Sequence, residues 1–383
     1  MTVWDDVVGQ PAAVTELDAA ASQESAMTHA WLFTGPPGSG RSNAARAFAA
    51  ALQCPYQGCG ECQACRTVLA GTHSDVREIN PEGLSISVRE MRDLVQIGAR
   101  HPYTGRWQIV IIADADRLTE GASNALLKAV EEPSPETVWL LCAPSDHPED
   151  VPLTIRSRCR PIYLRSPSPE AVAGVLRERD GIDPDQAHWA ASVCGGHVGR
   201  ARRLARDPQA RARREAILAV PTALRRLGDA FHHADALIRS AEGEADTLRA
   251  SRDEAEREEL AVAMGAGGTG KGAAAAARSA KAAEKDLEKR QKSRATRTQR
   301  DALDRALVDL AGFYRDVIVS ASGAPVPLAN PDREREIRTA AAEWGPESAL
   351  RRLEAVLACR EALAQNVKPR IAVEAMMTAL YRG

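Results

Sequence analysis

The sequence predicts an α/β domain built on a doubly wound parallel sheet, followed by a smaller and then a larger helical domain. Over residues 30–165, continuous apolar runs that suit strands buried on both faces alternate with helix-like stretches. A glycine-rich turn links the first of these strands to a helix. From residue 168 onward the pattern is helical, after a boundary at Ser166-Pro167-Ser168-Pro169.

Length and charge restrict the class of protein. A chain of 383 residues has room for two or three domains, each with its own core. The formal net charge of −2 excludes a globally basic DNA-coating protein, so any contact with nucleic acid needs a local patch or a larger assembly. The N-terminus shows no signal-peptide pattern, and the longest apolar runs, near 109–113 and 138–143, are too short to span a bilayer. The sequence therefore predicts a cytoplasmic protein without membrane contact.

The turn after the first strand has the form of a phosphate-binding loop. It reads Gly35-Pro36-Pro37-Gly38-Ser39-Gly40-Arg41-Ser42, between an apolar run at 30–33 and a helix-like stretch at 43–50. In this context the backbone N–H groups of the loop and the helix N-terminus can bind phosphate. The candidate phosphate-binding residues are Gly35, Gly38, Gly40, Arg41 and Ser42. The alternative is an ordinary turn between strand and helix.

Arg41 occupies the position at which such loops usually have Lys. Lys is a compact point charge, whereas Arg has a wide planar fork on a longer stem. We expect a loop that can still hold the phosphates of ATP or ADP but has lost the geometry for transferring the γ-phosphoryl group.

Four cysteines follow within twelve positions, namely Cys54, Cys59, Cys62 and Cys65. The last three have the spacing CxxCxxC, which is typical of tetrahedral zinc coordination by thiolates. Four thiolates leave no open position for water, so the predicted zinc is structural and residues 54–65 form a zinc module. The alternative is a redox disulfide or free thiols, although the cytosol keeps isolated thiols reduced.

The next buried strand, at residues 107–112, ends in Ala113-Asp114-Ala115-Asp116. Phosphate-loop ATPases place two acidic residues here, one near Mg²⁺ and one polarising the attacking water. The end of this strand does not offer two adjacent acids, because Ala113 precedes Asp114 and Ala115 follows it. One carboxylate is therefore missing, and Asp114 and Asp116 could equally be capping or solubilising residues at a strand end.

The remaining elements complete the predicted domains. A helix at 124–133 is closed by Pro133, a buried strand follows at 138–143, and Ser157-Arg158-Cys159 leads into a strand at 161–164. Residues 168–207 read as three short helices, and the last helices have apolar residues at helical spacing, at 303–317 and 350–363, which suit a core or a subunit contact. The predicted domains are 1–165, 166–210 and 211–383.

A charged insertion interrupts the third domain at about residues 240–298. Acids dominate 241–260 and bases dominate 271–300, and no aromatic residue occurs between Phe231 and Phe313. This pattern predicts a two-helix hairpin with opposed charges; partial disorder is the alternative, because few large apolar residues are present. The basic side could contact DNA phosphates or simply be solvated.

Together these features resemble the AAA+ clamp-loader family of bacterial DNA polymerase III. The resemblance rests on Val8-Gly9-Gln10, residues 29–40, the four cysteines, residues 124–133, Ser157-Arg158-Cys159 and residues 366–374. It covers residues 1–210 and, to a lesser extent, the C-terminal helices. It implies an AAA+ domain with an inserted zinc module, a small helical lid domain and an all-α collar that mediates oligomerisation and carries the helical-hairpin insertion.

Two branches of this family differ at the residues singled out above. The tau/gamma subunits hydrolyse ATP and keep the loop Lys and the acidic pair, whereas delta-prime subunits have a degenerate Walker A loop and retain Ser-Arg-Cys. With Arg41, an incomplete acidic pair and an intact Ser157-Arg158-Cys159, this sequence resembles the delta-prime type. The resemblance implies that Arg158 is an arginine finger, which enters the ATP site of the adjacent subunit in trans. From the residues alone, Arg158 could be a surface arginine like its neighbours Arg156 and Arg160.

The resemblance also implies partners and a role in replication. The chain would be neither a polymerase nor an efficient ATPase, but one subunit of the DNA polymerase III holoenzyme, assembled with tau/gamma and delta subunits. It would help to load the sliding clamp onto primer-template DNA, in the cytoplasm at the nucleoid-associated replisome. The alternatives are an ATP-hydrolysing tau/gamma-type subunit that tolerates Arg41, and a zinc-dependent nucleic-acid-binding module. Two features depart from the family: the gap between Cys54 and Cys59 is shorter than usual, and the 240–298 insertion is not general.

Overall fold

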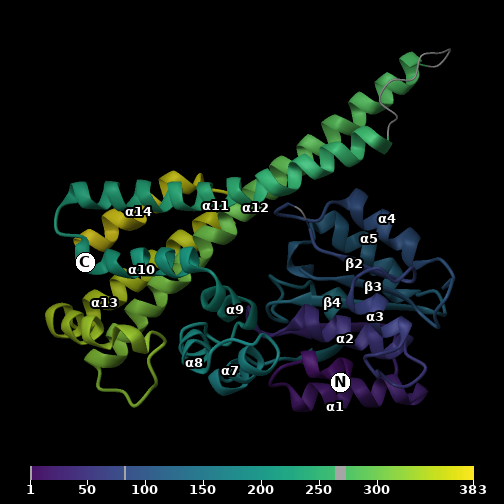
Figure 1. Cartoon of the computed structure of the whole chain (residues 1–383), viewed down its shortest axis with the longest axis horizontal. Helices are drawn as coiled ribbons and strands as arrows, with labels where there is room; N and C mark the ends of the chain where they lie inside the picture. The colour runs from purple at the N-terminus through teal and green to yellow at the C-terminus, as the bar shows by residue number, and fades with distance from the viewer. Residues whose placement is uncertain (1, 82, 264–272) are drawn as a thin grey trace. The chain divides into compact units, whose positions relative to one another are not determined.

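The structure is a computed structural model that describes residues 2–81, 83–263 and 273–383. It divides into two compact units, Met1–Arg206 and Asp207–Gly383, and each is described by itself (Figure 1). The separate lid at residues 166–210 stays a prediction. Among the described residues, no helix combines the length and the apolar character that crossing a membrane requires.

The first unit contains a five-stranded parallel sheet with the strand order β2-β3-β4-β1-β5. The strands are β1 (Ala30–Thr34), β2 (Val76–Ile79), β3 (Gln108–Ile112), β4 (Thr137–Ala143) and β5 (Arg160–Tyr163). Every residue of β1, β3 and β4 is buried, which confirms the strands predicted from continuous apolar runs. The edge strand β2 was not predicted, because its sequence Val-Arg-Glu-Ile has no such run.

Helices cover both faces of this sheet, as expected for a doubly wound fold (Figure 1). The helices of this unit are α1 (Pro11–Ser22), α2 (Arg41–Gln53), α3 (Gln63–Leu69), α4 (Val88–Gly98), α5 (Glu120–Glu131), α6 (Leu153–Arg156), α7 (Pro169–Glu178), α8 (Pro184–Ser192) and α9 (Val198–Arg206). Short 3-10 turns lie at Val3–Asp6, Glu24–Ala26 and Ala115–Arg117. The last three helices, α7 to α9, correspond to the three short helices predicted for residues 168–207.

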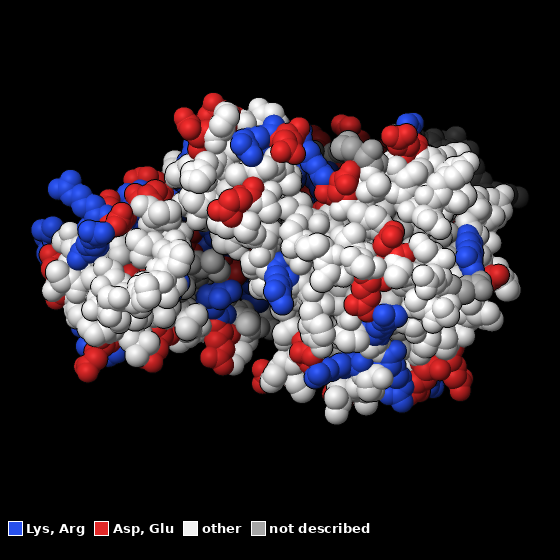
Figure 2. All heavy atoms as spheres, turned by 90° about the horizontal axis from the view of Figure 1, so that it is seen from below, with Lys and Arg blue, Asp and Glu red and all other residues white. Residues whose placement is uncertain are grey.

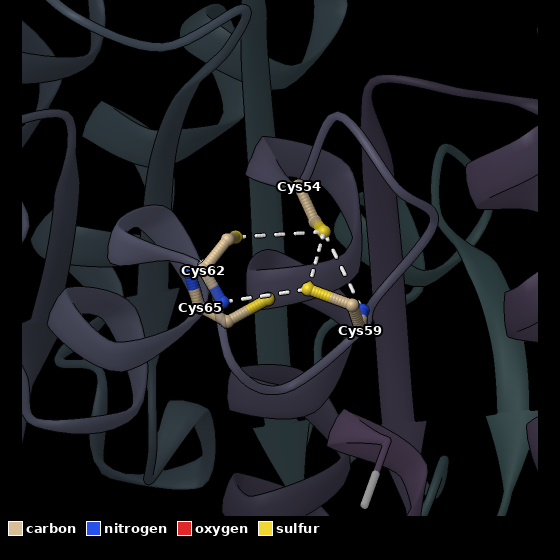
Figure 3. Close-up of side chains that lie close together, drawn as sticks. All are labelled: Cys54, Cys59, Cys62 and Cys65. Atoms are coloured by element: carbon tan, nitrogen blue, oxygen red, sulfur yellow. Dashed lines mark hydrogen bonds between the residues drawn. The ribbon is translucent and has the colours of Figure 1, made fainter.

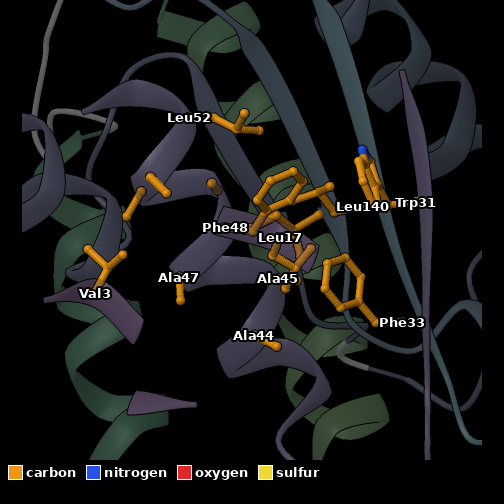
Figure 4. Packing of buried hydrophobic residues seen from close by; sticks show 14 of the residues in the cluster. Val3, Leu17, Trp31, Phe33, Ala44, Ala45, Ala47, Phe48, Leu52 and Leu140 are labelled. Carbon is orange, nitrogen blue, oxygen red and sulfur yellow. The ribbon is translucent and has the colours of Figure 1, made fainter. Parts of the chain in front are cut away.

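Successive residues of β1 point to opposite faces of the sheet, so one strand contributes to two cores. Trp31 and Phe33 pack with Phe48 of α2 and Leu17 of α1 (Figure 4), whereas Leu32 packs in the core formed with α4 and α5. The rings of Trp31 and Phe48 meet edge to face, with centroids 5.0 Å apart. This packing fixes α2, and with it the loop that precedes the helix.

Asp75 organises the loop that precedes β3. The backbone N–H groups of Tyr103, Thr104 and Gly105 donate to its buried carboxylate over 2.7–2.8 Å. Burial alone would raise the pKa of Asp75, but these donors lower it to about 2. The group therefore stabilises the fold at neutral pH, and this stabilisation is lost as the pH falls from about 4 toward 2.

We expect Asp75→Ala to lower the free energy of unfolding by about 2–3 kcal/mol at pH 7, because charge-assisted hydrogen bonds are lost and their donors remain buried. Urea unfolding of the variant and the wild type at several pH values measures this difference. The difference should shrink below pH 4, and a difference that is the same at pH 7 and pH 3 would contradict the assigned role.

The second unit is a helical bundle. Its helices are α10 (Pro208–Ala223), α11 (Leu227–Ala263), α12 (Ala273–Ala321), α13 (Glu334–Ala364) and α14 (Pro369–Arg382), with a 3-10 turn at Pro331–Arg333. The apolar residues predicted at helical spacing over 303–317 are buried in its core. In the second predicted set Val356 and Leu363 are buried, but Leu350 and Leu357 are 48% and 46% exposed, so that stripe is only partly core.

The charged insertion continues two helices of this bundle. α11 and α12 both run from the core into the insertion, where their far ends lie side by side (Figure 1). Arg294 bridges the two helices through Asp253 and Glu256, each at 2.7 Å. The predicted turn between them, residues 264–272, lies outside the described residues. On the face seen in Figure 2, basic and acidic side chains are interspersed, in agreement with the small net charge.

Candidate functional site

The glycines of the phosphate-loop candidate are required by its backbone. Gly38 and Gly40, between β1 and α2, have φ angles of 90° and 88°, in the left-handed region that glycine adopts at little cost. A Cβ atom on Gly38 would lie only 2.5 Å from the Cβ of His197, which precedes α9. The loop therefore packs tightly against the segment that leads into α9, within the same unit.

A buried glutamine fastens this loop to the sheet. The side-chain amide of Gln10 donates to the carbonyl of Ser39 at 3.3 Å, and its Oε1 accepts from the backbone N–H of Arg165 at 3.1 Å. Gln10 thus joins the loop to the chain just after β5. Sequence reasoning used the Val8-Gly9-Gln10 stretch only as part of a resemblance and assigned it no such contact.

Arg41 binds within its own loop. Its Nη1 donates to the carbonyl oxygen of Gly35, at the start of the loop. Arg46, one turn further along α2, donates through Nε and Nη2 to the two carboxylate oxygens of Glu78 at 2.9 and 2.7 Å. The cation that replaces the usual Lys is therefore engaged by the backbone of the loop.

A cavity of about 540 Å³ opens beside the loop. Its lining includes Gly38, Gly40, Arg41, Ser42, Arg46, Arg179, His197 and Arg202, with Asp6 as an acidic member. Clustered cations next to a helix N-terminus suit an anionic ligand such as phosphate. Arg179 pairs with Asp6, however, and Arg202 pairs with Asp180 at 2.7 Å, so an anion would have to share or displace these partners.

The acidic residues after β3 do not complete a hydrolytic site. Ala113 and Ala115, the residues on either side of Asp114, are both buried. Burial, and then the charge of Asp114, raise the pKa of Asp116, while Asp114 lies 3.7 Å from the Nε of Arg117. The strand end thus offers one carboxylate, Asp114, at the position of the usual pair.

Arg158 is held by three contacts near the end of α6. Its Nη1 donates to the carbonyl of Thr154 at 2.8 Å and to Oγ of Ser157 at 3.2 Å, and its Nη2 lies 2.6 Å from a carboxylate oxygen of Glu131 at the end of α5. The Arg158 side chain is 39% exposed. Cys159 is buried, and burial raises its pKa to about 12, so it is a packing residue and not a reactive thiol.

Arg158 and the phosphate loop lie at opposite ends of two adjacent strands. β1 and β5 are parallel neighbours, with Trp31 beside Arg160 and Thr34 beside Tyr163. The loop follows the carboxyl end of β1, whereas Arg158 precedes the amino end of β5. The intervening strand is about 10–13 Å long at roughly 3.3 Å per residue. Arg158 therefore points to a different surface from the one on which its own loop opens.

The four cysteines converge, as the sequence predicts. The sulfur atoms of Cys54, Cys59, Cys62 and Cys65 all lie within 4.8 Å of one another (Figure 3). The Cys54 sulfur is 3.6 Å from that of Cys59 and 3.7 Å from that of Cys62. Sulfurs in a tetrahedral zinc site with Zn–S bonds of about 2.3 Å are separated by about 3.8 Å. These residues could therefore bind a metal such as zinc.

Backbone N–H groups point at these sulfurs. Those of Tyr56 and Cys59 donate to Cys54 at 3.3 and 3.4 Å, and those of Cys62 and Cys65 donate to the preceding cysteine sulfur at 3.4 Å. Burial opposes ionisation of Cys54, but the backbone donors lower its pKa to about 7. Burial instead raises the pKa of Cys62 and Cys65, so Cys54 is the member of the cluster whose surroundings favour the thiolate form that a metal requires.

The short gap between Cys54 and Cys59 closes through two left-handed residues. Gln57 and Gly58 have φ angles of 57° and 87°. The carbonyl of Gly58 accepts from the backbone N–H of Val3 at 3.0 Å, and Cys65 is buried in the core with Phe48. The module therefore links the N-terminus to α2 and α3.

The family match lies within the first unit. A family model described as DNA polymerase III, delta subunit, matches residues 9–168. The delta' subunit of Bacillus subtilis (strain 168) is 31% identical over 209 residues, which are 54% of this chain and 62% of that protein. The tau subunit of the same organism is 35% identical over 182 residues, 46% of this chain and 31% of that protein. This chain thus spans less than two thirds of the length of either relative.

Among solved structures, a gamma subunit-related protein of DNA polymerase III from Thermotoga maritima is matched over 96% of this chain and 98% of that chain, at 14% identity and a TM-score of 0.41. That likeness is too weak to assign the fold. The delta' and tau relatives match at similar identities, so identity alone does not separate the two types. The family match and the relatives nevertheless confirm the resemblance drawn from the sequence: residues 9–168 match the family model, and the chain is similar to clamp-loader subunits of DNA polymerase III.

Proposed function

We propose that this chain is a delta-prime-type clamp-loader subunit that hydrolyses little or no ATP itself and supplies Arg158 to the ATP site of a neighbouring tau/gamma subunit. The observation that supports this most is the position of Arg158, which is half-exposed and lies at the amino end of β5, whereas its own phosphate loop lies at the carboxyl end of the neighbouring strand β1. A guanidinium placed there can serve a site on another subunit but not the site on its own chain.

The proposed chemistry is stabilisation of charge on the γ-phosphoryl group. An arginine finger contributes about 10³–10⁵ in rate in other phosphate-loop enzymes. The contacts with Thr154 and Ser157 orient the guanidinium of Arg158, and Glu131 holds it until a phosphate oxygen takes the place of the carboxylate. An exposed ion pair of this kind contributes about 0–1 kcal/mol, so a phosphate oxygen can replace the Glu131 carboxylate at little cost in free energy.

The phosphate loop of this chain is proposed to bind nucleotide without hydrolysing it. Arg41 is engaged by the Gly35 carbonyl, and Ala113 replaces one of the two carboxylates that hydrolysis needs. In this proposal ATP or ADP occupies the cavity beside Gly38, Gly40 and Ser42 without turnover; Gly35 is not among the residues that line it.

The remaining assignments follow from the family. The proposed partners are tau/gamma and delta subunits, the sliding clamp and, through the assembled ring, primer-template DNA in the cytoplasm. The second unit would form the collar, and a zinc ion held by Cys54, Cys59, Cys62 and Cys65 would stabilise the first unit without taking part in hydrolysis.

We expect the isolated chain to release phosphate from ATP at the rate of a protein-free control. Arg41→Lys should not restore turnover, because the second carboxylate is still missing at Ala113. Steady-state phosphate release from the wild type, Arg41→Lys and Arg41→Ala measures this.

The same assay distinguishes this proposal from its alternative, an ATP-hydrolysing tau/gamma-type subunit. The 35% identity to a tau relative is the observation that favours the alternative. Turnover by the isolated wild type that Arg41→Ala abolishes would support the alternative and overturn the proposal.

A further inference from the structure

We propose that the outer face of α12 in the charged insertion binds the phosphate backbone of duplex nucleic acid. The proposed surface, here called the lysine stripe, consists of Lys281, Lys285, Lys289 and Lys292. It lies in the second unit and is independent of the ATPase role proposed for Arg158.

The stripe lies on the side of α12 that faces away from α11. The side toward α11 is marked by Leu287 and Gln291, which are buried, and by Arg294. The Gln291 amide donates to the backbone carbonyl of Asp253 at 3.2 Å, which fixes this orientation. Successive residues are rotated by about 100° around the helix axis, so the four lysines fall within an arc of about 80°. The centre of this arc lies roughly opposite Leu287 and Gln291.

The charges of the stripe are free to meet a ligand. All four lysines are exposed, and among the described residues none of them forms an ion pair. Arg294, on the inner side, is instead bonded to Asp253 and Glu256, and its hydrogen bond lowers the pKa of Glu256 to about 2. The inner charges of the hairpin are thus neutralised within it, while the outer charges are not.

Exposed acidic residues border the stripe on one flank. At about 100° per residue around the axis of α12, Glu288 lies about 20° from Lys281, and Glu284 lies about 60° from it. The exposed acids Glu254 and Glu258 lie on α11, the other helix of the hairpin. The four lysines outnumber the two acids that border them, so an anion would bind along the lysine side of α12.

The length and chemistry of the stripe fit a polyphosphate backbone. From Lys281 to Lys292 the helix rises about 16 Å, which matches about five phosphates at roughly 3.4 Å per nucleotide of one strand. Lys side chains bind phosphates as point charges without reading sequence. The expected ligand is therefore a duplex bound without sequence preference.

Other macromolecules fit this surface less well. Single-strand binders stack bases on aromatic side chains, and this chain has none between Phe231 and Phe313. Protein interfaces need an apolar or aromatic centre, which a row of lysines does not provide. Backbone binding to a duplex needs neither, because its free energy comes from counterion release.

The test uses the full chain and a fluorescent 20-base-pair DNA duplex, with binding measured by anisotropy between 50 and 200 mM NaCl. In one variant all four lysines are changed to Gln, which keeps helix propensity; in the matched control all four are changed to Arg, which keeps the charge. With four phosphate contacts removed, the slope of log affinity against log salt should fall by about 3–4 in the Gln variant. Over this range the wild type should lose about 10²-fold more affinity than the Gln variant, and the Arg variant should behave like the wild type.

Three results would overturn the proposal. They are no binding of the duplex by the wild type at 50 mM NaCl, equal salt slopes for the wild type and the Gln variant, and loss of self-association instead of DNA binding in the Gln variant when sedimentation is measured. Circular dichroism shows whether the variants keep their helices. Arg158→Ala should leave duplex binding unchanged. A negative result for duplex binding would therefore not contradict the ATPase proposal, and a negative ATPase result would not contradict duplex binding.

Discussion

Replacing Arg158 by Ala is expected to lower hydrolysis at the neighbouring subunit's ATP site by about 10³-fold or more while the complex still assembles. The rate falls because charge on the γ-phosphoryl group loses its guanidinium. Assembly and folding survive because Arg158 is 39% exposed and its pair with Glu131 contributes only about 0–1 kcal/mol. The measurement is single-turnover ATP hydrolysis in a reconstituted complex whose other ATP sites carry an inactivated loop lysine.

The chain offers a matched control two residues away. Arg156 is also about 40% exposed and is held in a similar way, because it pairs with the Asp146 carboxylate at 2.9 Å and donates to the Asp146 backbone carbonyl at 3.1 Å. Arg156→Ala should leave hydrolysis near the wild-type rate. Arg158→Lys should restore only part of the activity, because an ammonium lacks the planar fork. Equal rates for Arg158→Ala and Arg156→Ala would remove the basis for a role in trans.

Removing the metal is the second change with a large expected effect. We expect metal analysis to find one zinc per chain, and chelation to lower the Tm of the first unit by about 10 °C. A ligand present at 1,000 times its Kd stabilises the folded state by about 4 kcal/mol, and for a unit of this size each kcal/mol is worth about 2–4 °C. Differential scanning calorimetry with and without chelator measures the shift.

Cysteine variants separate zinc binding from ordinary packing. Cys62→Ser should lose the metal and reproduce the effect of the chelator, because it removes one of the four thiolates. Cys194→Ala is the control, since Cys194 is buried in the same unit but outside the cluster of four. It should keep its zinc and lose only a little stability. Well-folded, metal-free wild-type protein with an unchanged Tm would refute the thiolate site.

The sequence predicted the elements whose pattern is set by burial. β1, β3 and β4 are buried on both faces, so each reads as an unbroken apolar run. The edge strand β2 has Arg77 and Glu78 in its middle and escaped prediction. Leu350 and Leu357 fit the helical period but are about half exposed, because periodicity does not show whether an apolar face is covered.

At the candidate sites, too, the sequence predicted only what depends on local spacing. The spacing of the four cysteines was enough to predict their convergence, since ligand spacing is a local property. The bond from Arg41 to Gly35 and the pair between Arg158 and Glu131 were not predicted. The first depends on the path of a loop, and the second joins positions that are far apart in the chain and meet only when α5 packs beside α6. Neither contact leaves a pattern in the composition of the sequence or in the spacing of its apolar residues.

The most direct test of the central claim compares ATP hydrolysis by the chain alone, by its partner subunits alone and by the reconstituted complex with wild-type or Arg158→Ala chain. The account predicts no turnover by the chain alone, stimulation of the partners by the wild type, and assembly without full stimulation by Arg158→Ala. Brisk turnover by the isolated chain, or full stimulation by Arg158→Ala, would contradict it.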